Sequence, residues 1–418
     1  MLEAPISEDE VKKAVWSCGG EKAPGPDGFS FDFIRAFWDC IGAEFVKATK
    51  EFEKEPTKVE ACNSSFIALV PKIKDPLGLN DFRPIHLMGC VTKVLSKVLA
   101  ERLKVVVSDI INPLQTAFIR GRQITDGPFM VNEIISWVKR TKKEMFILKV
   151  DFEKSFDNVR WDFIREILRQ MNFGDVWIDW IKGLICSAKV SVLVNGSPTN
   201  QFGLEKGVRQ GDLLSPYIFI IVMEGLILAL CEANEKRLIR GIELPNDGSV
   251  ITNLHYADDA LFLGKWNGAN IRHLMKVLQC FHKASGLKIN WNKSTLYGVG
   301  VHGSEVSCMA EDIGCSEGKM PFRYLGLPIG ADMSKRVNWI ALIDKFDKKL
   351  STWKEKALSV GGRLTLCKTV LGSLGVYLLS LYKAPSCVLK DLESKMRGFF
   401  WVRRATEIIW HGCLRIRC

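Results

Sequence analysis

Two adjacent aspartates interrupt an apolar segment and strongly constrain how this chain can fold. Residues 251–263 are apolar on both sides of Ala257-Asp258-Asp259-Ala260. Such a pattern fits a buried β-hairpin that carries two acids at its tip. A third acid, Asp151, directly follows residues 145–150, a short apolar segment with the length of a buried strand. The pattern therefore predicts strands that carry acidic residues at their ends.

Carboxylates gathered at strand ends need a compensating cation, because like charges raise one another's pKa. Mg²⁺ suits this role, since it prefers oxygen ligands and typically binds one or two carboxylates together with water and phosphate. Two such ions can activate an attacking hydroxyl and neutralise a leaving pyrophosphate. An Asp pair in a turn is more often simple turn chemistry. The pair alone is a weak signal, and the strand–Asp segment upstream strengthens it.

Helix and strand patterns are mixed along the rest of the chain. Apolar residues recur at helical spacing in 91–107 and 272–283, and a helix is expected over 161–172 with Gly174 as its C-cap. Residues 189–194 alternate polar and apolar and lead into Asn195-Gly196, a strong hairpin signal. Strands and helices do not alternate regularly, which favours an α+β fold.

The apolar stretch from Leu213 to Leu230 has the length of a membrane span. Glu224 lies inside it, and a carboxylate at the bilayer centre costs roughly 2.5–3.5 kcal/mol. Pro216 lies near the start, where the first turn of a helix tolerates proline. We therefore expect a buried core helix and no membrane partner.

Basic charge is concentrated near the C-terminus. The net charge is +11, and residues 331–418 hold 17 Lys and Arg against 7 Asp and Glu. This distribution favours binding of a polyanion such as nucleic acid; the plain alternative is a basic face that is only exposed to solvent. Apolar residues at helical spacing predict a helix from Trp339 to Lys356 with its lysines facing outward.

The cysteines indicate the compartment. Thirteen are scattered without a CxxC pair, and the N-terminal residues do not have the pattern of a signal peptide. Reduced thiols and an intracellular location, nuclear or cytoplasmic, are therefore expected.

Eight motifs in chain order resemble those of LINE-type (non-LTR) retrotransposon reverse transcriptases, in particular plant ones, and they extend over almost the whole chain. They are Lys22 to Phe29, Ala68 to Lys72 with Asn80 to Leu87, Gln115 to Arg122, Asp151 to Asp157, Gly207 to Pro216, Tyr256 to Asp259, Gly286 to Lys293 and Tyr324 to Pro328. The resemblance implies a right-hand polymerase: an N-terminal extension and fingers in 1–140, an antiparallel-sheet palm in 141–329, and a helical basic thumb with a truncated tail in 330–418.

The resemblance also implies roles for single residues. Asp151, Asp258 and Asp259 would hold two Mg²⁺ ions, with Mn²⁺ as a substitute, and would be catalytic together with Lys293, a candidate proton donor to pyrophosphate. Phe156 would be a ribose gate that selects dNTP over rNTP, with ordinary palm packing as its alternative role. The other nucleotide-binding residues would be Lys72, Arg83, Arg122, Gln210 and Gly211. The residues that bind the RNA template and DNA primer would be Arg209, Tyr324, Leu325, Gly326, Lys348, Lys349 and Lys356.

Some positions depart from the family pattern. Arg120 stands where many relatives have Pro, Ser155 where a small apolar residue is usual, His86 where Ser is common and Leu213 where Pro is common. Relatives usually carry an endonuclease domain upstream of the position of Ser7, so we expect a fragment of a longer polyprotein.

The expected function is RNA-directed DNA polymerase, which extends a DNA primer on an RNA template. Two alternatives remain open. One is a reverse transcriptase of the group II intron maturase type, which shares the palm motifs. The other is a decayed fragment that binds nucleic acid without catalysis.

Overall fold

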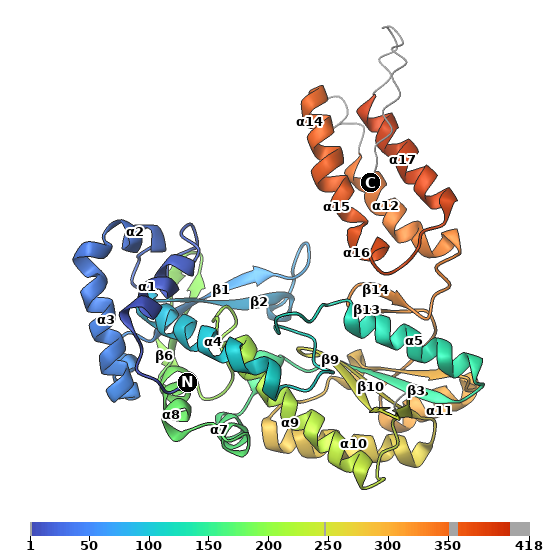
Figure 1. Cartoon of the computed structure of the whole chain (residues 1–418), viewed down its shortest axis with the longest axis horizontal. Helices are drawn as coiled ribbons and strands as arrows, with labels where there is room; N and C mark the ends of the chain where they lie inside the picture. The colour runs from blue at the N-terminus through green and yellow to red at the C-terminus, as the bar shows by residue number, and fades with distance from the viewer. Residues whose placement is uncertain (1, 246–247, 351–357, 402–418) are drawn as a thin grey trace. The chain divides into compact units, whose positions relative to one another are not determined.

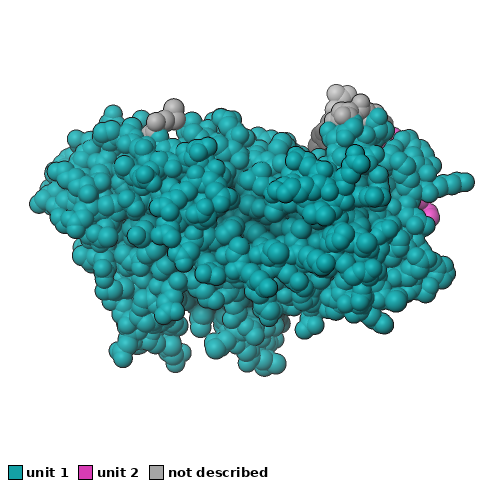
Figure 2. Space-filling model, turned by 90° about the horizontal axis from the view of Figure 1, so that it is seen from below, with its two compact units in different colours: residues 1–319 teal, residues 320–418 magenta. Residues whose placement is uncertain are grey.

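The computed structural model describes residues 2–245, 248–350 and 358–401. Contacts divide the chain into two compact units, residues 1–319 and residues 320–418, which Figure 2 colours separately. Helices and strands mix without a regular alternation, as the ribbon in Figure 1 shows. The expected α+β class is therefore confirmed. The division into fingers, palm and thumb at residues 140 and 329 stays a prediction.

Helices make up much of the first unit. The α-helices described there are α1 (Glu8–Ser17), α2 (Phe31–Ala36), α3 (Trp38–Lys54), α4 (Cys90–Ile110), α5 (Asp126–Arg140), α6 (Ser155–Asn158), α7 (Trp161–Gln170), α8 (Asp175–Cys186), α9 (Ser215–Glu235), α10 (Gly268–Ser285) and α11 (Gly303–Ile313). Short 3₁₀ segments are η1 (Pro56–Ala61), η2 (Leu79–Asp81) and η3 (Trp291–Lys293).

The loop that precedes α2 is tied to the start of α4. A carboxylate oxygen of Asp27 accepts a hydrogen bond from the backbone N–H of Cys90, which satisfies a donor at the helix N-terminus. Gly25 lies so close to the carbonyl of Met88 that a Cβ would approach its oxygen to 2.3 Å. Only glycine allows this approach, so the glycine-rich loop is needed for packing at this point.

Five strands form the N-terminal sheet. They are β1 (Ser64–Pro71), β2 (Phe82–Met88), β4 (Lys189–Val194), β5 (Ser197–Pro198) and β6 (Phe202–Gly203). Their order is β2-β1-β4-β5, with β6 also paired to β4; β1 is antiparallel to β2 and parallel to β4. Asn195 and Gly196 both have positive φ, which confirms the hairpin between β4 and β5.

The central sheet has the strand order β12-β11-β3-β10-β9. Its strands are β3 (Met145–Val150), β9 (Asn253–Tyr256), β10 (Asp259–Lys265), β11 (Thr295–Val299) and β12 (Ser316–Gly318), and the short pair β7 (Ile242–Glu243) and β8 (Val250–Ile251) forms a separate ribbon. β3 is antiparallel to both β10 and β11. The predicted strand 145–150 and the predicted acidic hairpin are therefore both confirmed.

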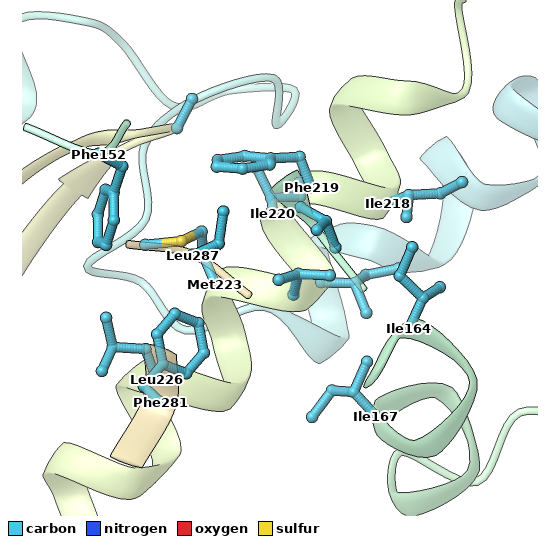
Figure 3. Close-up of a cluster of buried hydrophobic side chains, with 14 of the residues drawn as sticks. Phe152, Ile164, Ile167, Ile218, Phe219, Ile220, Met223, Leu226, Phe281 and Leu287 are labelled. Carbon is cyan, nitrogen blue, oxygen red and sulfur yellow. The ribbon is translucent and has the colours of Figure 1, made fainter. Parts of the chain in front are cut away.

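Helix α9 forms the centre of the first unit. It is long and apolar enough to cross a membrane, but most of its side chains are buried inside the protein. Figure 3 shows Phe219, Met223 and Leu226 of α9 converging with side chains of α7, α10 and the segment after β3. Each fully buried side chain of this kind contributes about 1.5–3 kcal/mol. The expected buried core helix is confirmed.

One predicted helix end was wrong. Helix α7 ends at Gln170, and Asn172 takes the positive φ of 59° that a chain reversal requires. Gly174 has a φ of −67° and is the N-cap of α8. Asn is one of the residues that tolerate the left-handed region, so it replaces the expected glycine cap.

The second unit is mostly helical. Its described elements are β13 (Phe322–Tyr324), β14 (Leu327–Ile329), η4 (Arg336–Trp339), α12 (Ile340–Lys349), α14 (Val360–Thr365), the π-helical η5 (Leu366–Leu371), α15 (Gly372–Leu374), α16 (Val376–Leu379) and α17 (Ser386–Phe400). The predicted helix from Trp339 to Lys356 is shorter at its start, because Trp339 closes η4 and α12 begins at Ile340. Lys356 lies outside the described residues.

Candidate active site

The segment after β3 that begins with Asp151 and the β9–β10 hairpin that carries Asp258 meet at one end of the central sheet. Val150, the last residue of β3, pairs with Ala260 near the start of β10. Asp151 lies directly beyond Val150, next to the hairpin turn that carries Asp258. The turn residue Ala257 has a φ of 53°, a left-handed conformation that is unusual for alanine. The sheet register therefore brings together two carboxylates that are far apart in sequence.

Two serine hydroxyls connect the acidic segments to their surroundings. The hydroxyl of Ser155 donates a hydrogen bond to Oδ2 of Asp258 at 2.8 Å. The backbone N–H of Asp151 donates to the hydroxyl of Ser294 at 3.3 Å, and this hydroxyl donates to the carbonyl of Asn290 at 2.8 Å. Both serines are buried, with exposed fractions of 6% and 0%. The two acids are therefore held by side chains from outside the hairpin.

The pKa values of Asp151 and Asp259 are both raised. Loss of solvent contact raises the pKa of the Asp151 carboxyl and neighbouring Asp258 raises it further, while the ammonium of Lys293 lowers it. The pKa of Asp259 is also raised, first by loss of solvent and then by the charge of Asp258. Lys293 in η3 is exposed and lies close enough to Asp151 for its charge to be felt. The end of the sheet has an excess of negative charge, which favours a bound cation.

The donor set suits a hard cation that is only partly bound by protein. Among the described residues, no group of three or more His, Cys, Asp or Glu side chains lies close enough to hold a metal alone. Asp151, Asp258 and Asp259 interact electrostatically and supply only oxygen ligands. Mg²⁺ typically takes one or two carboxylates and completes its shell with water and phosphate, so the residues fit this ion.

Gln210 and Gly211 lie in the loop that precedes α9. The side-chain amide of Gln210 donates to Oδ1 of Asp157 at 3.2 Å, and its backbone carbonyl accepts from the N–H of His86 at 2.8 Å. Gly211 has a φ of 104°, and a Cβ there would lie 3.1 Å from the carbonyl oxygen of His86. The loop therefore docks closely against β2, and it requires glycine at this position.

Phe156 stacks on a core aromatic ring. Its ring lies 4.7 Å from that of Phe219 in α9, with an interplanar angle of 11°. The side chain is only half-buried, so part of it stays accessible from solvent. Both roles considered for Phe156, core packing and nucleotide selection, are compatible with this position.

The basic residues expected to bind nucleotide differ in exposure and in the hydrogen bonds they already make within the protein. Arg83 is exposed on β2, and Lys72 is exposed with its ammonium donating to the carbonyl of Asn80 at 3.0 Å. Burial raises the pKa of the Asp157 carboxyl, and the hydrogen bond from Gln210 and the charges of Lys154 and Lys72 lower it only in part. Arg122 instead donates to four backbone carbonyls, those of Ser108, Ile111, Asn112 and Gln115. Arg122 thus closes the C-terminus of α4, where carbonyls lack helix partners.

Arg209 is also engaged within the protein. Its guanidinium is 3% exposed, forms an ion pair with Asp212 at 2.9 Å and donates to the side chain of Asn63. A buried, paired arginine holds the loop of residues 207–214 to the start of the N-terminal sheet. The Arg209 guanidinium, which was expected to contact template and primer, instead binds Asp212 and Asn63 next to Gln210.

The other expected template–primer residues lie in the second unit. Tyr324 ends β13, and Leu325 and Gly326 form the turn to β14 with φ of 49° and 81°. The Tyr377 hydroxyl donates to the carbonyl of Leu325 at 2.8 Å, which fixes this turn. Lys348 and Lys349 are exposed in the last turn of α12.

A cavity of about 530 Å³ lies beside the acidic hairpin. It is lined by Lys104, Thr116, Phe118, Ile119, Arg120, Arg122, Ile124 and Tyr256. Tyr256 immediately precedes the turn that holds Asp258, so the cavity opens next to the acids. Lys104 and Arg120 give it a basic lining that the sequence motifs did not predict, because the two residues come from separate segments.

Comparisons with known proteins agree with the motifs. A family model described as reverse transcriptase (RNA-dependent DNA polymerase) matches residues 70–329. The chain is 27% identical over 407 residues to the transposon TX1 149 kDa protein of Xenopus laevis, covering 96% of this chain and 30% of that protein. It is 24% identical to the Pol polyprotein of retrotransposable element R2DM of Drosophila melanogaster, covering 96% of this chain and 38% of that protein.

Among solved structures, an apo telomerase from Candida tropicalis aligns with a TM-score of 0.46 and 14% identity over 90% of this chain and 68% of that chain. The chain spans less than half the length of the two retrotransposon relatives.

Proposed function

Because this chain belongs to the reverse transcriptase family, in its LINE-type non-LTR branch, we propose that it extends a DNA primer on an RNA template as part of a longer retrotransposon protein. Reverse transcriptases use divalent metal ions and act on nucleic acid. The observation that carries the proposal for this chain is the convergence of Asp151 and Asp258 at one end of the central sheet, beside Lys293. The relatives are retrotransposon proteins, which favours this function over that of an intron maturase.

Asp151, Asp258 and Asp259 would hold two Mg²⁺ ions, or Mn²⁺ in their place. Bound there, the ions would lower the pKa of the primer 3′-hydroxyl and neutralise the leaving pyrophosphate. The protein's part is to present carboxylate oxygens from strand ends that the sheet holds in register. Lys293 is offered as the proton donor to pyrophosphate, because its ammonium lies within electrostatic reach of Asp151.

The incoming dNTP would meet residues of the N-terminal sheet, of α6 and of the loop before α9. Lys72 and Arg83 supply exposed cations for the triphosphate, and an arginine can bind it bidentately. Phe156 would exclude the 2′-hydroxyl of an rNTP, and Gln210 with Gly211 would contact the base pair being formed. Arg122 is the weakest member of the expected set, since its donors already bind the end of α4.

The RNA template and DNA primer would also contact the second unit. Tyr324, Leu325 and Gly326 would act at the primer end, and Lys348 and Lys349 would contact backbone phosphates, which position a duplex without reading its sequence. We further propose that the protein acts inside the cell, in the nucleus or cytoplasm. The cysteines in the described part of the chain are all free, as a reducing compartment favours.

Primer extension on poly(rA)/oligo(dT) with Mg²⁺ and dTTP tests the proposal. Asp151→Asn and Asp258→Asn should each abolish extension and leave template–primer binding largely intact, because phosphoryl transfer depends on charge neutralisation by the metal. Asp162→Asn, at an exposed aspartate of α7, is the matched control and should extend normally. No extension by the unaltered chain, or extension by either of the two acidic-site variants, would overturn the proposal.

A further inference from the structure

Ser155 connects the two acidic segments of the active site. It is the first residue of α6 and follows Lys154, whose φ of 44° and ψ of 55° are left-handed. This sharp change of direction turns the chain after Asp151 back toward the hairpin. The hydroxyl of Ser155 donates to Oδ2 of Asp258 at 2.8 Å, although the two residues are 103 positions apart. A strained backbone residue therefore helps to bring this hydroxyl to the hairpin.

The hydrogen bond restricts Asp258 in a specific way. A carboxylate on a hairpin turn can rotate about its side-chain bonds, and a hydrogen bond to one oxygen limits this rotation. Ser155 is only 6% exposed, so water competes poorly for the hydrogen bond. Hydrogen bonds to metal-ligating carboxylates fix their orientation, and loss of such a partner typically costs about 10–100-fold in metal affinity or activity.

The hydroxyl is not needed to fill space at this position. Alanine differs from serine only by this one oxygen, so an alanine fits the same backbone without the hydrogen bond. Ser155→Ala therefore removes the hydrogen bond without adding a steric clash.

We propose that Ser155 is a positioning residue for Asp258, whose hydroxyl fixes the orientation in which this carboxylate meets a divalent cation. The inference rests on the proposed polymerase function. It predicts that cation affinity depends on the hydroxyl.

Binding of Mn²⁺ to the full chain, followed by electron paramagnetic resonance without nucleotide or primer, gives a readout separate from activity. Ser155→Ala should weaken Mn²⁺ binding about 10-fold or more. Ser155→Thr keeps the hydroxyl and should bind within about twofold of the parent chain. Asp258→Asn gives the baseline for a damaged site. Ser285→Ala is the matched control, because Ser285 is fully buried and its hydroxyl donates to the carbonyl of Phe281.

Primer extension across a Mg²⁺ series gives the second readout. Ser155→Ala should raise the Mg²⁺ concentration for half-maximal rate by a similar factor and recover most of its rate at high Mg²⁺. Equal Mn²⁺ affinity of Ser155→Ala and the parent chain overturns the inference, as does a lower rate that Mg²⁺ cannot restore. If the parent chain binds Mn²⁺ but extends no primer, the proposed function fails while the Mn²⁺ comparison still decides the role of Ser155.

A double-mutant cycle covers the case in which Ser155→Ala is poorly folded. The unfolding free energies of Ser155→Ala, Asp258→Ala and the double variant, measured without metal, give the coupling between the two side chains. A directly bonded pair should show non-additive effects on unfolding. Additive effects would show that the hydroxyl and the carboxylate do not interact, and the inference would then be overturned.

Discussion

The side-chain oxygen of Gln115 accepts a hydrogen bond from the backbone N–H of Ala257 at 3.0 Å. Gln115 is fully buried, and the same oxygen also accepts from the N–H of Ala117 at 3.0 Å. Ala257 is the left-handed turn residue that precedes Asp258. A glutamine of the segment before α5 thus supports the turn that carries Asp258, the acid proposed to bind metal.

Gln115→Ala should therefore destabilise the protein and slow primer extension. It leaves two buried N–H groups without an acceptor, at a cost of about 1–3 kcal/mol each, partly offset because it also removes the buried amide N–H of Gln115, which has no hydrogen-bond partner. Urea unfolding and extension rates measure both effects. Gln201→Ala, at an exposed glutamine, is the control and should change neither. An unaltered unfolding midpoint in Gln115→Ala would show that the turn does not depend on this bond.

Phe156→Ala should raise incorporation of rNTP relative to dNTP. Removal of the ring would leave room for a 2′-hydroxyl, while loss of the stack on Phe219 should also lower stability. Phe163→Ala removes another half-buried ring that packs edge-on against Phe281, and it controls for stability. The ratio of kcat/KM for dTTP and UTP is the measurement; the same ratio in both variants would assign Phe156 to packing alone.

Glu224→Gln should stabilise the protein above pH 6 and have little effect near pH 4.5. Burial raises the pKa of Glu224 to about 6, against a hydrogen bond from the N–H of Asn112 and the charge of Arg122, which lower it. A raised folded-state pKa means that stability is full below pH 4.5 and declines as pH rises through 6. The shift corresponds to about 2 kcal/mol at pH 7. Urea midpoints of both chains at pH 4.5 and 7.5 test this, and an equal difference at the two pH values would contradict it.

Lys348→Ala combined with Lys349→Ala should weaken template–primer binding for all sequences alike. Removal of each lysine–phosphate interaction should reduce the log–log salt slope by up to about one unit. Lys356 belongs to the same predicted basic surface and can be added as a third substitution. Lys12→Ala with Lys13→Ala on α1 matches the loss of charge at another exposed site. If the Lys348/Lys349 and Lys12/Lys13 variants showed equal template–primer affinity and equal salt slope, Lys348 and Lys349 would not contact the duplex and would serve only as solvent-exposed charges.

Local patterns predicted the elements that carry the acids. Strand β3 and the hairpin of β9 and β10 are each encoded within a few residues, so apolar spacing and turn residues were sufficient. Helix ends were less predictable. Asn172 made the turn expected of Gly174, because either residue type can adopt the required backbone.

The roles of single cations could not be predicted from motifs. Arg122 and Arg83 look alike in sequence, yet Arg122 binds four carbonyls and Arg83 is exposed. The partners of Arg122 belong to the end of α4, and only the tertiary structure brings them within reach. Ser155 and Ser294 were not predicted as site residues for the same reason, since each acts on an acid from a distant segment.

The central position of β3 also sets the order of events during synthesis. β3 pairs with β10 and β11, which emerge from the ribosome more than one hundred residues later. At about 5–20 residues per second, a largely apolar strand remains with both edges unpaired for roughly 5–20 s. Strands that pair over such long sequence distances form slowly and leave unpaired edges that can aggregate. The nascent chain should therefore depend on chaperones at this stage, and its proposed active site can form only after residue 293 has been made.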